Sequence, residues 1–233
     1  MNEHLRNNSQ ELQNSGPREI LQWAIDEFWP DIAMSTGFGA SGMVLIHLIS
    51  QIKPEMKIIF LNTGFHFQET LLFKERIKDL YKVNIVEHHG AITKEELFQR
   101  ISPHPFHDNP DLCCQINKVE PLKTALEAYQ LRAWVSALRR DQSSTRKHID
   151  ILEEYEGGLV KINPLTNWTK KEIWNYLHLN KIPYHPLHDQ GYPSVGCEPC
   201  TKSVSEGEHE RSGRWEGKGK KECGIHTFLK KVT

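Results

Sequence analysis

Short, largely apolar runs alternate with amphipathic segments along the first 180 residues of the chain. Residues 31–35 and 57–61 are compact apolar runs of the kind found in strands buried on both faces. Between 17 and 29 the apolar residues recur at helical spacing instead, behind a proline that suits the first turn of a helix. The same contrast predicts further helices at 43–52, 67–81, 111–129 and 169–179, and further strands at 83–87 and 133–138.

The order of these elements predicts the fold class. Strand, turn and helix recur in sequence, which indicates a doubly wound, mostly parallel α/β sheet covered on both faces. In such sheets, ligands bind beyond the carboxyl ends of the strands. Polar or glycine-rich turns follow three predicted strands, at 35–42, 62–66 and 139–142. We therefore expect the ligand site where these three turns meet.

The periodic pattern ends at about residue 182, where glycine, proline and charged residues begin to dominate. With 233 residues, 38% of them hydrophobic and 25% charged, the chain suits one globular domain. We expect a polar N-terminal extension at 1–16, an α/β domain at 17–200 and a basic, mobile C-terminal tail at 201–233.

The composition also suggests a compartment. No apolar run approaches the roughly 20 residues that cross a bilayer, and the polar first 15 residues lack the apolar core of a signal peptide. We therefore expect a cytoplasmic protein. A net charge of −1 gives no general attraction for nucleic acid or membrane, and neither is expected as a partner. In a reducing compartment, grouped cysteines serve more often as ligands or catalysts than as disulfides.

Four of the five cysteines form two close pairs. Cys113 and Cys114 are adjacent, and Cys197 and Cys200 are separated by two residues. Four thiolates of this kind suit an iron–sulfur cluster, in which adjacent cysteines can bind separate irons. A tetrahedral zinc site, which usually takes spaced pairs, stays an alternative.

The fifth cysteine has different surroundings. Cys223 lies close to Lys220, Lys221 and His226, and positive charge near a thiol favours the reactive thiolate. We interpret Cys223 as a nucleophile; the alternative is an ordinary exposed thiol in a frayed tail. Among the 13 histidines, only His226 and His66, which follows a predicted strand, lie close to candidate site residues.

The glycine-rich turn at 35–42 is a candidate anion site. Gly37, Gly39 and Gly42 permit unusual backbone angles that bring N–H groups close to a ligand. The helix that follows would add its positive N-terminal end. The segment matches neither the P-loop nor the dinucleotide-binding motif. A plain strand-to-helix connection without a ligand is the alternative.

Taken together, these motifs resemble the assimilatory adenylyl-sulfate reductases, the cluster-containing branch of the adenylyl- and phosphoadenylyl-sulfate reductase family. The matching segments occur in the family's order from about residue 20 to residue 228, and the combination is highly specific. They are 35–42, 61–64, 113–118, 138–143, 196–201, 213–215 and Glu222-Cys223-Gly224-Ile225-His226.

The resemblance implies a fold and a reaction. The fold would be of the adenine nucleotide alpha hydrolase-like type, with the nucleotide and a cluster bound by 17–200 and the catalytic cysteine in the tail. Cys223 would attack the sulfur of adenylyl sulfate and release AMP, leaving an S-sulfocysteine, with His226 in support. Thioredoxin or glutaredoxin would then release sulfite, a step of sulfate assimilation that supplies cysteine biosynthesis. The paired cysteines would hold a [4Fe-4S] cluster that keeps its oxidation state, with Lys118 between cluster and substrate.

The resemblance also implies how the anionic substrate is held. Backbone N–H groups of the glycine-rich turn and nearby cations would bind its phosphate and sulfate, through charge-assisted contacts that are stronger than neutral ones. The implied substrate-binding residues are Ser35, Thr36, Gly37, Phe38, Gly39, Ser41, Asn62, Thr63, Gly64, Lys118, Arg139, Arg211 and Arg214.

Four positions depart from the family pattern. Asn117 stands in place of an arginine, Asn62 of an aspartate, Gly37 of a serine and Ser41 of an acidic residue. Their effect on the nucleotide contacts stays open, as does the choice between adenylyl sulfate and phosphoadenylyl sulfate. The residues also leave open the reductant and a homo-oligomeric state. A non-catalytic redox-sensing module that binds an iron–sulfur cluster or zinc is the rival from another functional class.

Overall fold

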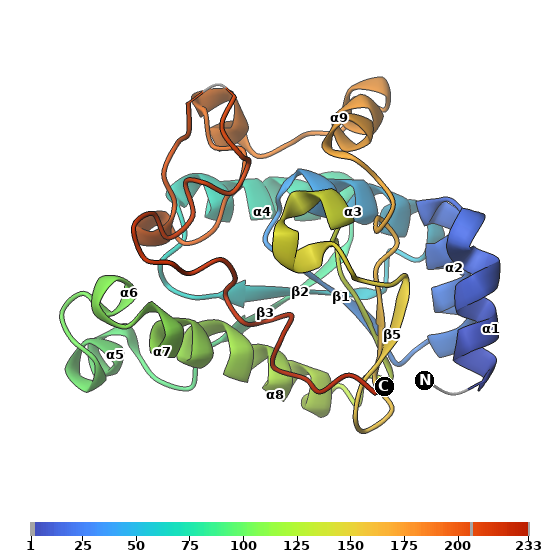
Figure 1. The fold of residues 1–233 in the computed structure, drawn as a ribbon, viewed down its shortest axis with the longest axis horizontal. Helices are drawn as coiled ribbons and strands as arrows, with labels where there is room; N and C mark the ends of the chain where they lie inside the picture. The colour runs from blue at the N-terminus through green and yellow to red at the C-terminus, as the bar shows by residue number, and fades with distance from the viewer. Residues whose placement is uncertain (1–2, 206, 233) are drawn as a thin grey trace.

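The computed structural model describes residues 3–205 and 207–232, and its centre is a six-stranded sheet (Figure 1). In spatial order the strands are β3-β2-β1-β4-β6-β5, and only the edge strand β5 runs antiparallel to its neighbour. This arrangement confirms the predicted mostly parallel α/β sheet. The strands are β1 (Ile32–Thr36), β2 (Lys57–Asn62), β3 (Asn84–His89), β4 (Ala133–Val135), β5 (Leu152–Glu154) and β6 (Val160–Ile162).

Helices cover both faces of the sheet, as expected for a doubly wound fold (Figure 1). On one face, Met34 and Ile58 pack in the main core together with helices before and after the central strands. These helices are α2 (Pro17–Phe28), α3 (Ala40–Ile52), α4 (Gln68–Tyr81) and α9 (Lys170–Leu179). On the other face, Ala33 and Ile59 pack against α8 (Glu120–Ala128). β1 is therefore buried on both sides, which explains its apolar sequence.

The predicted helix at 111–129 is interrupted. It consists of α7 (Pro110–Cys114), a π-helical turn at Gln115–Val119 and α8. Pro121 has no N–H to bond to the carbonyl of residue 117, so a regular α-helix cannot continue there. The π turn contains Lys118 and places it directly after the adjacent cysteines.

Several elements differ from the predicted boundaries. In the predicted polar extension, residues 1 and 2 lie outside the described residues, but α1 (Glu3–Glu11) is helical and buries Leu5. β4 ends three residues earlier than expected. The antiparallel pair β5–β6 was not predicted, although Gly157-Gly158, both with positive φ, is a hairpin signal. Two short helices also went unpredicted, α5 (Lys94–Arg100) and α6 (Pro105–Asp108).

The described part of the C-terminal tail, 201–205 and 207–232, folds back over the sheet. Its last residues pair with the edge of β5: the Val232 N–H donates to the Glu154 carbonyl at 2.8 Å, and the Glu156 N–H donates to the Lys230 carbonyl at 3.0 Å. Phe228 packs on the same face of the sheet as α8. Among the described residues, we find no helix with the length and apolar character that a bilayer span requires.

Candidate active site

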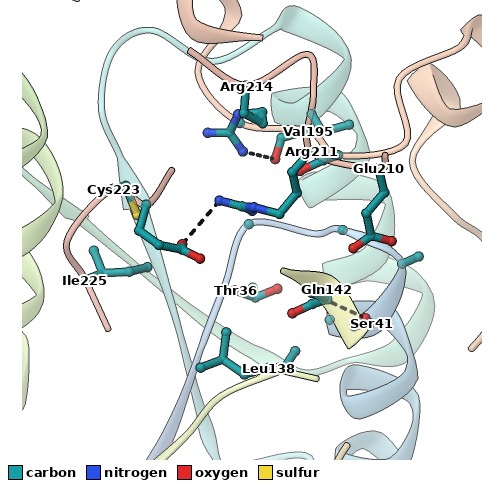
Figure 2. A pocket seen from close by; sticks show the side chains of 18 of the residues that line it. Thr36, Ser41, Leu138, Gln142, Val195, Glu210, Arg211, Arg214, Cys223 and Ile225 are labelled. Atoms are coloured by element: carbon teal, nitrogen blue, oxygen red, sulfur yellow. Dashed lines mark hydrogen bonds and ion pairs between the residues drawn. The ribbon is translucent and has the colours of Figure 1, made fainter. Parts of the chain in front are cut away.

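A cavity of about 260 Å³ opens at the carboxyl ends of β1 and β4, where the sequence predicted a ligand site. Figure 2 shows Arg211 and Arg214 on one side, the turn with Ser41 on another, and Cys223 on the chain segment beside them. Twelve of the predicted site residues line this cavity. They are Ser35, Thr36, Gly37, Gly39, Ser41, Lys118, Arg139, Cys197, Arg211, Arg214, Cys223 and His226.

The remaining predicted substrate residues lie elsewhere. Phe38 is fully buried in the core, with its ring against Phe60. Asn62 accepts a hydrogen bond from the Gly64 N–H at 3.0 Å and donates one to Glu87 at 2.7 Å. Thr63 lines a different, cysteine-lined cavity. Of the turn after β2, only His66 lines the large cavity, so the three predicted turns converge only in part.

The glycine-rich turn does not work as expected. None of its three glycines has a positive φ; the residue with φ 58° is Phe38, whose N–H donates to the Thr36 hydroxyl at 3.0 Å. The expectation of unusual backbone angles at the glycines is therefore wrong. What Gly42 provides is space, because a Cβ atom there would lie 2.7 Å from the Thr36 hydroxyl oxygen. α3 begins at residue 40 and directs its N-terminus toward the cavity, as a site for anions requires.

Arg139 is fixed at the end of the segment that follows β4. Its side chain is 3% exposed and donates to the Ser41 hydroxyl at 2.6 Å and to Asp141 at 2.8 Å, while Glu210 lies 3.3 Å away. Ser41, one of the departures from the family pattern, therefore has a structural role as a neutral acceptor. The arginine is held rigidly and needs no reorganisation to meet an anion.

Lys118 lies close to three sulfur atoms. Burial alone would lower the pKa of Lys118, but the neighbouring sulfurs of Cys197, Cys223 and Cys114 outweigh it and raise the pKa. Its ammonium group therefore stays protonated. Lys118 lines both the large cavity that contains Cys223 and the smaller cavity of the paired cysteines.

Two of the histidines that line the cavity, His66 and His226, are neutral. Burial lowers the pKa of His66 to about 4, while its Nε2 bonds to the Leu61 carbonyl at 2.9 Å. Burial and Lys161 lower the pKa of His226, which stacks on Trp134 with ring centroids 5.4 Å apart. A neutral His226 adds no positive charge beside Cys223, so its contribution there is packing of the tail. Lys220, also expected to supply charge, forms an ion pair with Asp111.

Sequence reasoning missed Arg146 and Glu210 of the cavity wall, and it noted Trp215 and Glu222 only as parts of motifs. Glu222 precedes Cys223 and accepts hydrogen bonds from Arg146 at 2.7 and 2.8 Å. Its position next to the proposed nucleophile was a usable signal. Nothing in the sequence indicated the pairing with Arg146, which lies 76 residues away.

The four paired cysteines line one smaller cavity between α7 and the end of β2. Cys113, Cys114 and Cys197 are buried, Cys200 is partly exposed, and all are free thiols. The Glu198 N–H donates to the Phe65 carbonyl at 2.8 Å, which holds the second pair against the first.

The sulfur atoms of this cavity have polar neighbours. The Thr63 hydroxyl lies 3.2 Å from Cys197 Sγ, and Asn117 Nδ2, at another departure from the family pattern, lies 3.7 Å from Cys113 Sγ. Burial and the neighbouring sulfurs raise the pKa of Cys113 to about 12, and burial raises that of Cys114 to about 11. Burial also raises the pKa of Cys200, so three of the four thiols resist ionisation unless a cation compensates them.

The donor set fits an iron–sulfur cluster. Four sulfurs, with no carboxylate or imidazole among the residues that line the cavity and with the aromatic side chains of Phe65 and Phe106 beside them, match the soft, sheltered environment that such clusters occupy. Within the described ranges, no three His, Cys, Asp or Glu side chains are grouped so that they could hold a single metal ion.

The chain is similar to proteins of a known family. The model of the phosphoadenosine phosphosulfate reductase domain matches residues 31–203. Over 220 residues, the chain is 42% identical to the adenosine 5′-phosphosulfate reductase of Bacillus mycoides, covering 94% of this chain and 93% of that protein. The chain belongs to the phosphoadenosine phosphosulfate reductase family.

Two solved structures are similar to this chain. The phosphoadenylyl-sulfate reductase of Candida auris, in a phosphate complex, superposes with a TM-score of 0.74 at 29% identity, covering 88% of this chain and 98% of that one. The FMN adenylyltransferase of Candida glabrata shares the fold, with a TM-score of 0.62 at 16% identity over 87% of this chain and 67% of that one. The reductase family match spans the sheet and the cysteine cavity, and Cys223 follows it in the tail.

Proposed function

We propose that this reductase converts adenylyl sulfate to sulfite and AMP in sulfate assimilation, through an S-sulfocysteine on Cys223 and with thioredoxin or glutaredoxin as reductant. One observation supports this most directly. Cys223 lines the same cavity as the glycine-rich turn and a set of cationic side chains. A sulfur nucleophile therefore faces a pocket suited to a small, highly charged anion.

In the first step, the Cys223 thiolate attacks the sulfur of adenylyl sulfate. The new bond joins the two sulfur atoms, the bond between that sulfur and the phosphoryl oxygen breaks, and AMP leaves with the electron pair. Lys118, close to Cys223, would stabilise both the thiolate and the sulfate oxygens.

The charge of the cavity suits this substrate. The lining residues include six cationic side chains, Lys118, Arg139, Arg146, Lys170, Arg211 and Arg214, and two carboxylates, Glu210 and Glu222. The excess positive charge would bind the phosphate and sulfate and stabilise the charge that develops on AMP. Because Arg139 is already fixed by Ser41 and Asp141, it binds without losing side-chain freedom.

In the second step, a thiolate of the reductant attacks Cys223 Sγ and sulfite leaves with the electron pair. The second thiol of the reductant then attacks the mixed disulfide, so the reductant is oxidised to a disulfide and Cys223 is regenerated. The tail would have to move away from the cavity to meet a protein reductant. We assign 17–200 as the nucleotide- and cluster-binding domain, 201–233 as the tail that supplies the nucleophile and 1–16 as an N-terminal extension whose Leu5 and Leu12 pack in the main core. We place the reaction in the cytoplasm.

We further propose that Cys113, Cys114, Cys197 and Cys200 hold a [4Fe-4S] cluster. When bound, the group would supply fixed positive charge to the four thiolates and link α7 to the 197–200 turn. Thr63 and Asn117 would then donate hydrogen bonds toward its sulfur ligands.

The decisive test is intact-mass spectrometry of the anaerobically purified protein after exposure to adenylyl sulfate without reductant. We expect the mass of one SO3 group on the wild type, located on Cys223, and none on Cys223→Ser. Addition of reduced thioredoxin should release sulfite. No adduct on the wild type would refute the reductase and favour a non-catalytic binding module.

The same measurement with phosphoadenylyl sulfate separates the two nucleotide substrates. The similarity to curated adenosine 5′-phosphosulfate reductases leads us to expect faster adduct formation with adenylyl sulfate. Equal rates would indicate a dual-specificity enzyme. Faster reaction with phosphoadenylyl sulfate would reverse the assignment.

A further inference from the structure

Glu222, the residue directly before Cys223, accepts hydrogen bonds from several side chains. Arg146 donates two parallel hydrogen bonds to the Glu222 carboxylate, Nε to Oε1 at 2.8 Å and Nη2 to Oε2 at 2.7 Å. The Thr145 hydroxyl donates a third at 2.9 Å, and Arg211 Nη2 a fourth at 3.2 Å. A two-pronged arginine–carboxylate contact fixes direction as well as distance.

This contact is sheltered from water. The side chains of Arg146 and Glu222 are only 11% and 16% exposed, unlike the ion pairs on the outer surface. Burial alone would raise the pKa of Glu222, but the hydrogen bond and charge of Arg146 outweigh it and lower the pKa. The pair is therefore intact at neutral pH and is strong enough to hold a chain segment that has no regular secondary structure.

The segment that binds the tail is itself held by hydrogen bonds. Arg146 belongs to η4 (Ser144–Arg146), and its Nη1 donates to Gln142 Oε1 at 2.5 Å. Gln142 in turn accepts from the backbone N–H of Arg139 at 3.1 Å. The turn that follows β4 thus holds Arg139 for the substrate and Arg146 for the tail.

We propose that Arg146 and Glu222 are a positioning pair that docks the tail and keeps the adjacent Cys223 thiol directed into the cavity during the first step. Neither residue acts on the reacting atoms in this proposal. Arg211 is shared, since it also donates to the Lys221 carbonyl at 2.8 Å, but its charge is available to the substrate because Glu222 keeps its bidentate partner. The role in catalysis rests on the proposed function; the docking role does not.

Alkylation of Cys223 tests the docking without any substrate. We would measure the rate of reaction with iodoacetamide in the anaerobic, iron-loaded protein by peptide mass spectrometry. Loss of buried, charge-assisted hydrogen bonds should release the tail and raise this rate about tenfold in both Glu222→Gln and Arg146→Met. Glu216→Gln is the matched control, because Glu216 is a carboxylate of the same tail whose exposed ion pair with Lys202 joins two residues of the tail itself, and its rate should stay within about twofold of wild type.

The two variants also separate position from charge. Removing Glu222 favours the thiolate, whereas removing Arg146 disfavours it. A rise in both variants therefore supports docking, while opposite changes, or no change in either, would overturn the proposal. Should Glu222→Gln fail to fold, Glu222→Asp allows the same comparison with the charge retained.

A double-mutant cycle on the first step tests the catalytic part. Each single variant should slow formation of the adduct about a hundredfold at saturating adenylyl sulfate, with half-saturation changed less than threefold. The double variant should be no slower than the singles, since both remove the same contact. Additive losses, or a change confined to half-saturation, would show that Arg146 binds substrate instead. If the wild type forms no adduct, the proposed function fails, and the alkylation result still decides the docking.

Discussion

Lys118 and Cys197 line both the large cavity and the cysteine-lined cavity, so the two sites share one wall. Burial alone would raise the pKa of Cys197, but Lys118 and the Thr63 hydroxyl outweigh it and lower the pKa. The same ammonium group lies close to Cys223. A substitution at Lys118 should therefore change the electrostatic surroundings of Cys197 in one cavity and of Cys223 in the other.

Replacing this lysine should impair chemistry more than binding. We expect Lys118→Met to lower kcat by about 10² to 10³, the usual loss for one preorganised charge near the reacting atoms. Steady-state kinetics with adenylyl sulfate and reduced thioredoxin measures this. Lys123→Met, on the exposed face of α8, is the control and should match wild type. Normal kinetics in Lys118→Met would contradict the assignment.

The cysteines should divide into two classes by their effect on iron. Cys197→Ala should lose most of the bound iron and sulfide, because it removes one of four ligands from a buried set. Cys223→Ser should keep both. Elemental analysis and visible absorbance of anaerobically purified protein distinguish the classes. Zinc in place of iron in the wild type would decide for the tetrahedral alternative.

Gly213 is required by close backbone packing. A Cβ atom there would lie 2.2 Å from the Lys202 carbonyl oxygen, and Lys202 is held close because its N–H donates a hydrogen bond to the Gly213 carbonyl at 2.8 Å. We expect Gly213→Ala to cost about 2 to 4 kcal/mol of unfolding free energy and to displace Arg214. Gly37→Ala, where a Cβ atom would meet nothing within 4 Å, should change stability by less than about 1 kcal/mol. Denaturant unfolding of the two variants provides the comparison, and equal costs would refute the argument.

Stability should fall on mild acidification because of a buried histidine. His185 is fully buried, its Nε2 lies 2.9 Å from the Thr70 hydroxyl, and burial lowers its pKa to about 4. The unfolded chain, with an ordinary histidine pKa of about 6.5, binds the proton first, so this contribution is present above that pH and lost as the pH falls toward 4.

The loss between pH 7 and pH 5 should be about 2 kcal/mol larger in wild type than in His185→Gln. Thermal or denaturant unfolding at the two pH values measures the difference. His148→Gln, at an exposed histidine, should keep the wild-type pH dependence. Equal pH dependence in wild type and His185→Gln would contradict the buried, neutral state.

The sequence predicted the fold where the pattern was local. α9 begins after Thr169 with the predicted capping box to Glu172, and β1 and β2 were recognisable because burial on both faces leaves few polar residues in them. The edge strand β5 has only three residues, two of them glutamates, and gave no such signal. Its short pairing depends on β6 and a glycine turn, not on its own composition.

The site was predicted in its residue types but not in its pairings. Cysteines are recognisable by their spacing, so the four proposed ligands and the proposed nucleophile could be named from the sequence alone. The partners of Arg211 and Arg146 could not be predicted, because ion pairs between loops that are distant in sequence produce no periodic pattern in it. Phe38 illustrates the opposite error: it lies within a matching motif, yet its ring belongs to the core, and only its backbone belongs to the turn.

The pairing of Lys230–Val232 with the outer side of β5 has a mechanical consequence. A sheet edge with free N–H and carbonyl groups invites another chain to add a strand, and here the chain's own terminus occupies that edge. If the tail moves far enough to break this contact, the movement that exposes Cys223 to a reductant also exposes the edge of β5. Self-association of the enzyme would then occur only during the second step of the proposed reaction, when Cys223 is exposed to the reductant.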